Sequence, residues 1–316
     1  MADEIVQVVV GVLPDHRGNV LIAKRPESAH QGGLWEFPGG KIEPGESSLN
    51  ALGRELEEEL GVVIHSQSCV PLLKIPFAYP DKKVELDIWQ VNQFEGKPHG
   101  REGQILSWVP IQGLENYQFP RANRSIVRAL QLPRVVAITG AYSSDEDFSN
   151  KLADCLKKEV KLLHLRLADD ANLESLTTIA AKLCVEFGAE LVLNTSVRCY
   201  ARLKNLGATG LHVNSRRLLQ LDSRPVDAGQ RFSASCHNLK ELHHAQNIGA
   251  DYVLLSPVEP GTSHHDARAL RWSEFRELRL AVSLPVYAHG GLHMENLEQA
   301  IHMGAHGIAA TSALWS

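Results

Sequence analysis

Three glutamates and an arginine stand close together in one short segment, namely Arg54, Glu55, Glu58 and Glu59. In a helix, residues three and four positions apart share a face, so these carboxylates would lie side by side. Crowded carboxylates repel each other unless a cation lies among them, and hard oxygen ligands suit Mg²⁺ or Mn²⁺ better than zinc. A run of glutamates by itself is typical of a solvated acidic face. The adjacent arginine and the glycine pair Gly39-Gly40 favour the cation site instead.

The same segment has the pattern of a helix that ends before Gly61. Ser47 or Ser48 can cap its first turn, and a glycine favours the end of a helix. A leucine stripe would face the protein interior and leave the glutamates on another face. The stripe consists of Leu49, Leu52, Leu56 and Leu60. The spacing therefore predicts a helix that holds the carboxylates together.

These residues are part of a longer pattern, G-x5-E-x7-R-E-U-x-E-E-x-G-U with U apolar, which runs from Gly40 to Val62. The chain matches this pattern at every defined position, and in this it resembles the Nudix hydrolases. The resemblance implies hydrolysis of a nucleoside diphosphate that is linked to another group, with Mg²⁺ as cofactor and Mn²⁺ as a possible substitute. In chemical terms this is attack of water on phosphorus while a cation neutralises the developing charge.

The resemblance also implies roles for individual residues. Glu55, Glu58 and Glu59 would be metal ligands, and the Gly39 carbonyl would complete the metal shell. Arg54 would hold the carboxylates in place. One of these glutamates, or a later glutamate in a loop, would activate the water.

The sequence around this pattern resembles one branch of the family, the MutT-type pyrophosphatases, over nearly all of residues 4 to 131. The segments that carry this resemblance read LIAKRPESAHQGGLWEFPGGKIEPGE, AYPDKKVELDIWQV, FEGKPHGREGQ and FPRANRSIV. It implies 8-oxo-dGTP as the preferred substrate, with 8-oxo-dGMP and pyrophosphate as products, and a role in nucleotide-pool sanitation and DNA repair. A thiamine-pathway diphosphate is the alternative substrate, because it would explain the fusion described below.

Within this branch the resemblance places Arg25, His30 and Phe37 in the nucleotide pocket. It places Asn123 against the edge of the oxidised purine, and Glu102 beside the metal as an extra carboxylate. An amide suits that edge, because it can donate and accept a hydrogen bond at once.

A chain of 316 residues favours two domains, and the pattern of strand-like and helical stretches changes near Leu132-Pro133. Before this point the sequence mixes helical stretches with strand-like runs at 5–14, 19–25, 83–96 and 105–111. We therefore expect a first domain at 1–132, for which the resemblance implies a Nudix α/β/α sandwich, and a second domain at 133–316.

The second part of the chain contains eight short apolar runs that alternate with amphipathic helical stretches. The runs lie at 134–140, 160–167, 190–195, 210–214, 231–237, 251–258, 285–291 and 306–314. Strands that alternate with helices form a parallel sheet, and eight such units predict a closed (β/α)8, or TIM, barrel. At under about 200 residues it would be a compact example of this α/β fold.

This part resembles thiamine-phosphate synthase and its non-synthase relatives over roughly residues 134 to 316. The resemblance rests on SCHNLKELHHAQNIGADYVLLSPV and on PVYAHGGLHMENLEQAIHMGAHGIAATSAL. Backbone N–H groups at Gly290, Gly291 and near Ser312 would cradle the phosphate of a small ester, as the last two strands of such barrels do. Alternatively, the glycines only allow a tight turn.

Several positions depart from the synthases of this family. Where they carry Q-x-R-x-K, this chain has His164 and Ala168 at the first and last positions. Thr195 and Arg217 stand where they have magnesium-binding aspartates, and His264 replaces a lysine. A diphosphate carried on Mg²⁺ could hardly be held in the same way, so we expect no thiamine-phosphate synthase activity.

Three polar side chains remain near the expected strand ends, His237, His212 and Asn194. One relative in this family tautomerises a thiazole carboxylate phosphate, and histidine is a suitable proton carrier near neutral pH. Histidines inside barrels are more often structural. The barrel could therefore be a tautomerase, a ligand-binding sensor that regulates the hydrolase, or a stabilising element.

The overall composition gives no sign of a polymer or membrane partner. The formal net charge is −5 and the pI about 6.3, which argues against binding to nucleic acid polymers or anionic lipid through overall charge. The 5 cysteines are widely spaced, so no disulfide framework is indicated. No apolar run reaches membrane-spanning length. We expect a cytoplasmic protein, and the sequence leaves its oligomeric state open.

Overall fold

The structure is a computed structural model, and it describes residues 5–28, 31–78, 83–166, 172–259 and 269–315. Contacts within the chain divide it into two compact units, Met1–Leu132 and Pro133–Ser316. Each unit has a hydrophobic core of its own.

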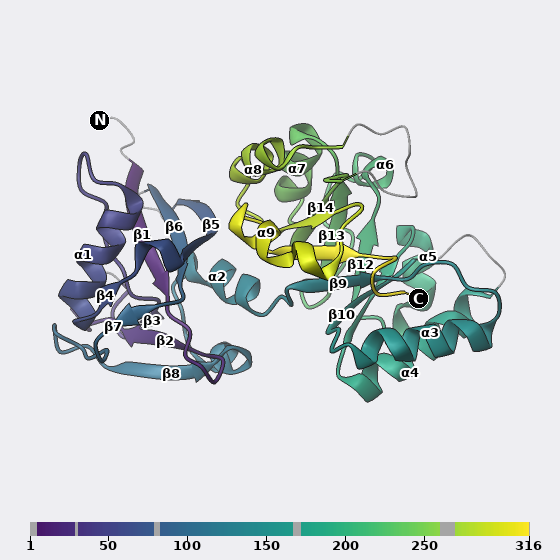
Figure 1. Ribbon diagram of the computed structural model, residues 1–316, viewed down its shortest axis with the longest axis horizontal. Coiled ribbons are helices and arrows are strands. Elements are labelled where there is room, and N and C mark those ends of the chain that lie inside the picture. Colours follow the sequence, from purple (N-terminus) through teal and green to yellow (C-terminus); the bar gives the residue numbers. More distant parts are fainter. Residues whose placement is uncertain (1–4, 29–30, 79–82, 167–171, 260–268, 316) are drawn as a thin grey trace. The chain divides into compact units, whose positions relative to one another are not determined.

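The N-terminal unit is built on two three-stranded sheets and one two-stranded sheet (Figure 1). In the first sheet, β6 pairs in parallel with β1 and antiparallel with β5; the strands are β1 (Ile5–Val12), β5 (Cys69–Ala78) and β6 (Lys83–Val91). The second sheet is antiparallel and consists of β2 (Asn19–Lys24), β3 (Trp35–Glu36) and β8 (Leu106–Pro110). The short pair is β4 (Val63–Ile64) and β7 (Phe94–Glu95).

Helices cover both faces of the first sheet. Val9 of β1 packs in a core with α1 (Ser48–Leu60), whereas its neighbour Val10 packs in a core with α2 (Asn123–Leu130). Successive strand residues point to opposite faces, so the sheet lies between the two helices. This confirms the Nudix α/β/α arrangement. Two short 3₁₀ helices, η1 (Ser66–Ser68) and η2 (Ile111–Asn116), complete the unit.

The predicted strands of this unit are present, but the sequence analysis missed β5. Pro71 and Pro76 lie within this strand and obscure its pattern. The strand order β1-β6-β5 leaves β5 at the sheet edge, where a residue without an N–H donor is tolerated. The register also shifts between Pro71 and Leu73, which further breaks the alternation of side chains.

The C-terminal unit is a closed barrel of eight parallel strands, as predicted. Each strand pairs with the next along the chain, and the last pairs with the first. The strands are β9 (Val135–Ile138), β10 (Leu162–Arg166), β11 (Glu190–Asn194), β12 (Gly210–Val213), β13 (Arg231–Cys236), β14 (Tyr252–Leu255), β15 (Val286–His289) and β16 (Gly307–Ala310). Because they are parallel, all their carboxyl ends meet at one rim.

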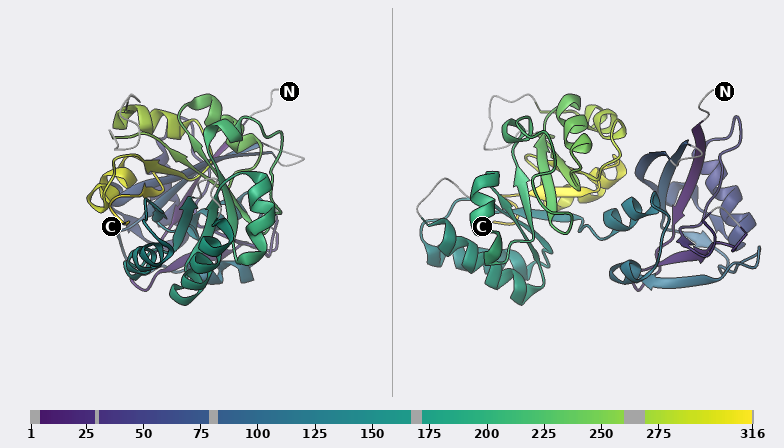
Figure 2. Two further views of the ribbon diagram at one scale, coloured as in Figure 1. Left: turned by 90° about the vertical axis from the view of Figure 1, so that its right-hand side faces the viewer. Right: turned by 180° about the vertical axis from the view of Figure 1, so that it is seen from behind.

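Helices surround this barrel (Figure 2). They are α3 (Asp145–Lys157), α4 (Leu173–Phe187), α5 (Val197–Leu203), α6 (Ser215–Leu218), α7 (Leu239–Asn247), α8 (Trp272–Leu280) and α9 (Leu297–His302), with the 3₁₀ helices η3 (Lys204–Leu206) and η4 (Met294–Asn296). In the described part of the chain, no helix combines the length and the apolar character that a membrane crossing requires.

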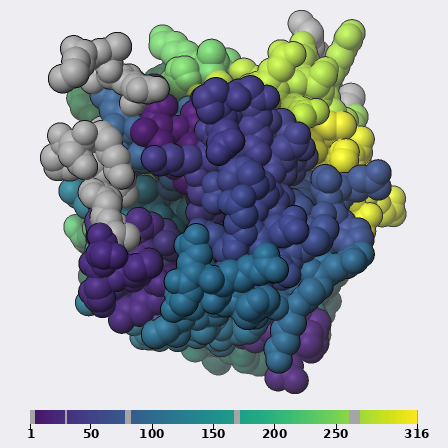
Figure 3. Space-filling view, turned by 90° about the vertical axis from the view of Figure 1, so that its left-hand side faces the viewer, coloured from purple at the N-terminus to yellow at the C-terminus, as the bar shows by residue number. Residues whose placement is uncertain are grey.

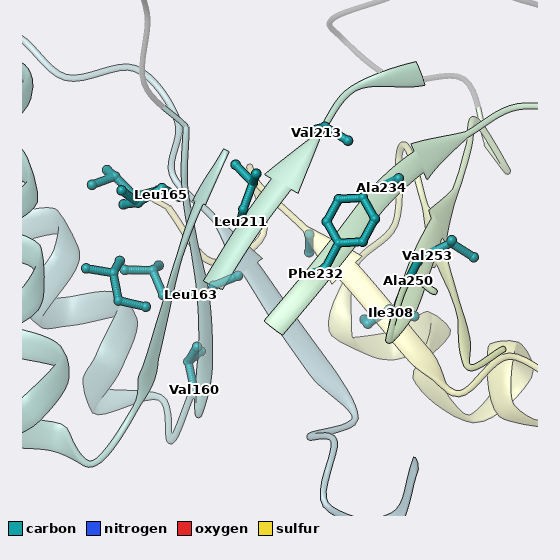
Figure 4. Packing of buried hydrophobic residues seen from close by; sticks show 14 of the residues in the cluster. Val160, Leu163, Leu165, Leu211, Val213, Phe232, Ala234, Ala250, Val253 and Ile308 are labelled. Atoms are coloured by element: carbon teal, nitrogen blue, oxygen red, sulfur yellow. The ribbon is translucent and has the colours of Figure 1, made fainter. Parts of the chain in front are cut away.

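The barrel strands alternate between an outer apolar face and a polar interior. Leu163, Leu211 and Phe232 belong to the core between strands and helices (Figure 4). Their neighbours His164 and His212 are fully buried and point to the other face, the barrel interior. This interior is more polar than the branched aliphatic layers that are usual in such barrels.

Candidate active site

Helix α1 orients the charged residues as the sequence predicted. The Ser47 side chain accepts a hydrogen bond from the Asn50 N–H at its start, and Gly61 ends it with φ 69°. Three of the four leucines of the predicted stripe are fully buried, and Leu49 is partly buried. The helix is therefore fixed by its apolar side, and its acidic side chains are left for other contacts.

Arg54 gathers three of the carboxylates around its guanidinium group. Its Nη1 lies 2.8 Å from Glu55 Oε1 and 3.3 Å from Glu58 Oε2. Its Nε and Nη2 donate to the two oxygens of Glu46 at 3.1 and 3.0 Å, and Nη2 also donates to the Lys41 carbonyl at 3.0 Å. The Arg54 hydrogen bond holds the pKa of Glu46 below its usual value. The network fixes the position of Glu55 relative to the loop before the helix.

The glycine pair before the helix leaves room for strand β1 and for the Glu55 carboxylate. A Cβ at Gly40 would stand 2.2 Å from Glu55 Oε2, and a Cβ at Gly39 would stand 2.2 Å from the Val9 carbonyl. Gly39 also has a φ of 143°, and its N–H donates to Glu59 Oε2 at 3.2 Å. Any side chain at either position would displace strand β1 or the carboxylate itself.

Glu59 is the most perturbed acid of the site. Burial raises the pKa of its carboxyl to about 8, although the hydrogen bond from the Gly39 N–H acts in the opposite direction and lowers the pKa. The charges of Glu36, Glu55 and Glu102 raise it further. Four carboxylates therefore lie close enough to repel one another, two from α1, one from β3 and one from the loop after β7.

Glu36 was missed by the sequence analysis. Its side chain forms an ion pair with Arg25, and burial raises the pKa of its carboxyl while Arg25 opposes that rise. It lies outside the defined positions of the motif, so the spacing pattern gave no signal for it. Its place in the stretch WEFPGG, three residues before Gly39, is the only hint in the sequence.

The donor set fits a hard divalent cation. All side-chain donors are carboxylate oxygens, which Mg²⁺ and Mn²⁺ prefer. The raised pKa of Glu59 has burial as its main cause and the neighbouring carboxylates as a smaller one, and a bound cation would lower it. Within the described ranges, no three His, Cys, Asp or Glu side chains are already converged as a formed metal site.

The predicted nucleotide pocket is only partly defined. Phe37 is 2% exposed and stacks on Phe119 with 5.6 Å between ring centroids. Asn123 begins helix α2, is 8% exposed, and its buried Oδ1 has no hydrogen-bond partner in the described part of the chain. Arg25 bonds Glu36 as stated above, and His30 lies outside the described residues.

In the barrel, the predicted ligand residues lie at one rim. Gly290 and Gly291 follow β15 with φ values of 97° and 64°, and Ser312 lies in the turn after β16. His237 follows β13, and its Nδ1 lies 2.7 Å from the Ser256 carbonyl oxygen. A carbonyl can only accept, so Nδ1 donates and the neutral ring carries its lone pair on Nε2.

His212 and His164 lie deeper than their neighbours at the rim. His212 Nδ1 and Nε2 lie 2.8 and 2.9 Å from the hydroxyls of Ser233 and Ser235. His164 Nε2 lies 2.7 Å from the Tyr252 hydroxyl. Burial, and then the positive charge that His289 can carry, lower the pKa of His212 to about 3, so it is neutral near pH 7.

Comparisons with known proteins match both units. Residues 9–129 match the family described as NUDIX domain, and residues 135–314 match the family described as thiamine monophosphate synthase. Over 125 residues the chain is 37% identical to 8-oxo-dGTP diphosphatase of Escherichia coli K12, which covers 40% of this chain and 95% of that protein. Over 185 residues it is 30% identical to putative thiamine-phosphate synthase 2 of Aquifex aeolicus, covering 58% of this chain and 98% of that protein.

Among solved structures, a MutT protein from work on Aliivibrio salmonicida and Vibrio cholerae is 40% identical. The match covers 40% of this chain and 97% of that chain, with a TM-score of 0.36. The family matches and the relatives from Escherichia coli and Aquifex aeolicus show that the chain belongs to two families, the Nudix hydrolases through its N-terminal unit and the thiamine monophosphate synthase family through its C-terminal unit.

Proposed function

We propose that the N-terminal unit hydrolyses 8-oxo-dGTP to 8-oxo-dGMP and pyrophosphate, with Mg²⁺ as cofactor and Mn²⁺ as a possible substitute. The observation that carries this proposal is the arrangement of the α1 glutamates, because Arg54 holds Glu55 and Glu58 and the Gly39 N–H donates to Glu59. Relatives named 8-oxo-dGTP diphosphatase support the choice of substrate. The free state of all five cysteines supports a reducing compartment, the cytoplasm, where such a nucleotide would be met.

In this proposal the glutamates of α1 bind the metal, and one of the site's acids also accepts a proton. Glu55, Glu58 and Glu59 ligate the metal together with the Gly39 carbonyl, and Glu102 adds a carboxylate from its loop. The bound cation supplies charge that neutralises the phosphate oxygens during attack by water. One of these acids accepts the proton of the attacking water. Arg54 positions Glu55 and Glu58 through the ion pairs described above.

We propose that Asn123 recognises the oxidised base through a hydrogen bond. Among the described residues its buried Oδ1 has no hydrogen-bond partner, which costs about 1–3 kcal/mol unless a ligand supplies a donor. An 8-oxopurine carries a hydrogen on N7, whereas guanine has a lone pair there. The carbonyl oxygen of Asn123 would accept a hydrogen bond from the N7–H of the 8-oxopurine and would repel the N7 lone pair of guanine. Arg25, His30 and Phe37 complete the nucleotide pocket in this proposal.

A comparison of substrates tests the assignment of the hydrolase. We expect kcat/KM to be highest for 8-oxo-dGTP, lower for dGTP and lowest for thiamine-related diphosphates, with pyrophosphate released from the nucleotides. The competing proposal, a hydrolase of thiamine-pathway diphosphates, rests on the fusion to the barrel. A higher kcat/KM for a thiamine-related diphosphate would favour it and refute ours.

For the barrel we propose binding of a small phosphate ester at the rim formed by Gly290, Gly291 and Ser312. The left-handed turn at the two glycines supports this, because it leaves backbone N–H groups without side chains to cover them. His237 would carry a proton to or from the ester through Nε2, since Nδ1 is occupied by the Ser256 carbonyl. Tautomerase chemistry and a sensor role both remain compatible with this geometry.

Calorimetry of the full chain with a thiazole phosphate ester tests the barrel proposal. We expect heat of binding that is lost when Gly290 is replaced by a bulkier residue, because a Cβ there would stand 2.9 Å from Pro257 Cα. An absence of binding heat together with an unchanged thermal midpoint would contradict it.

A further inference from the structure

The segment between β7 and β8 lies along the last turn of the catalytic helix α1 (Figure 3). The His99 N–H donates to the Leu60 carbonyl at 3.1 Å, and the Arg101 N–H donates to the Glu59 carbonyl at 2.9 Å. Arg101 Nη1 also donates to the Glu57 carbonyl at 2.9 Å. The last carbonyls of a helix have no partner within the helix, so this segment caps α1.

Gln104 connects this segment to α1 in a second way. Its side-chain Nε2 donates to the Glu59 carbonyl at 3.1 Å, and its Oε1 accepts from the Glu102 N–H at 2.9 Å. An amide side chain donates from its nitrogen and accepts at its oxygen without carrying a charge. One half-buried side chain therefore joins the backbones of two residues whose carboxylates belong to the same site.

The glycines in and before the turn between Arg101 and Gln104 allow the Gln104 side chain to reach the Glu102 N–H. Gly103 has a φ of 80°, and its N–H donates to the Gly100 carbonyl at 3.3 Å. A Cβ at Gly100 would stand 2.1 Å from the Gln104 carbonyl oxygen and 3.0 Å from its Oε1. Glycine at position 100 therefore lets the chain fold back so that the amide reaches Glu102.

Capping alone does not account for Gln104. The Glu59 carbonyl already accepts the Arg101 N–H, so α1 would stay capped without the amide. Glu102 is exposed on its loop, and its charge repels that of Glu59. The Arg101 N–H already links this loop to α1. Gln104 adds a second link, which fixes the backbone N–H of Glu102 itself relative to the Glu59 carbonyl.

We propose that Gln104 is a positioning residue that keeps Glu102 beside Glu59, so that the loop carboxylate and the helix carboxylate act on one cation and one phosphate chain. This inference rests on the proposed role of Glu102 in hydrolysis. Gln104 itself contacts neither the metal nor the nucleotide.

A double-mutant cycle tests this role in the full chain, with 8-oxo-dGTP as substrate and Mg²⁺ titrated. We expect Gln104→Ala to lower kcat about tenfold and to raise the Mg²⁺ concentration for half-maximal rate, as loss of a ligand's supporting hydrogen bond does. KM for the nucleotide should stay within about twofold. In the Glu102→Gln background, adding Gln104→Ala should change kcat by less than about twofold, because the group to be positioned is gone.

Two further variants separate positioning from folding. Gln104→Met keeps the length and the apolar stem without either hydrogen bond, so it should reproduce the loss of kcat with a thermal midpoint close to that of the parent. Gln112→Ala alters an exposed glutamine on η2 and should change neither kcat nor the Mg²⁺ dependence.

The outcomes are distinguishable. A tenfold loss from Gln104→Ala that persists in the Glu102→Gln background would show a structural role and overturn the proposal. So would full activity of Gln104→Ala and Gln104→Met while Glu102→Gln is impaired. If Glu102→Gln itself leaves kcat unchanged, the proposed role of Glu102 fails, and the role of Gln104 fails with it.

Discussion

At the scale of single residues, the chemistry follows from where each acid lies rather than from the number of acids. Glu58 is 58% exposed at its side chain and forms an ion pair with Arg54, whereas Glu59 is half-buried among other carboxylates. Replacing the two would therefore have different structural effects, although the proposed ligand set contains both.

Glu58→Gln should lower kcat by about two orders of magnitude or more, the usual contribution of a carboxylate that binds the metal or moves a proton. The thermal midpoint should hardly change, since an exposed ion pair contributes little to stability. Steady-state kinetics and thermal unfolding check this together. Normal turnover by the folded variant would refute the assignment of the helix.

The buried histidine of the barrel gives a prediction for pH. The pKa of His212 falls from the ordinary 6.5 to about 3 in the folded chain, mainly through burial. Below pH 6.5 the unfolded chain therefore binds a proton that the folded chain does not. Stability is fully present above pH 6.5 and falls toward pH 3, by at most about 1.4 kcal/mol per pH unit. His212→Asn should flatten the pH dependence of the thermal midpoint between pH 6.5 and 5, and an unchanged slope would contradict this.

At the scale of elements, the motif helix and its end at Gly61 could be predicted from the sequence, and the structure selects Ser47 from the two predicted caps, Ser47 and Ser48. Fixed spacing and a leucine stripe determine such a helix locally. Strand β5 could not be predicted in the same way, because its prolines are acceptable only at a sheet edge. Glu36 reaches the site through the pairing of β3 with β2, which depends on contacts far along the chain.

Replacement by alanine should have different effects on kcat at two glycines, one before this helix and one within it. At Gly40 a Cβ would stand 2.2 Å from the Glu55 carboxylate, so Gly40→Ala should displace Glu55 and remove most activity. At Gly53, within α1, the nearest atom would be 3.8 Å away. Gly53→Ala should therefore keep kcat and raise stability by about 0.4–1 kcal/mol through the lower entropy of the unfolded chain. Equal effects of the two changes on kcat would contradict this account.

At the scale of the whole molecule, the sequence predicted two folds and eight barrel strands, and the structure confirms both folds. The regular alternation of apolar runs and helices made the barrel predictable. The interior of the barrel was less predictable, because the sequence places His212 near an expected strand end and gives no sign that His164 lies inside the barrel. The structure buries both among tyrosine and serine hydroxyls.

The barrel should not form thiamine phosphate. The position of the synthase glutamine is taken by His164, which is buried and bonded to Tyr252, and Arg217 replaces an acidic magnesium ligand. We expect no condensation of a pyrimidine diphosphate with a thiazole phosphate above background in the full chain. Substantial turnover in that assay would show that the barrel has another way to hold the diphosphate.

The central claim is that this chain selects an oxidised purine nucleotide through Asn123 and hydrolyses it at α1. The most direct measurement is the ratio of kcat/KM for 8-oxo-dGTP to that for dGTP, in the parent, in Asn123→Ala and in Asn116→Ala, which alters an exposed asparagine. Loss of a hydrogen bond of about 1.4 kcal/mol corresponds to a tenfold change. We predict a ratio well above one in the parent and in Asn116→Ala, and a ratio about tenfold lower in Asn123→Ala. A ratio near one in the parent, or an unchanged ratio in Asn123→Ala, would contradict the account.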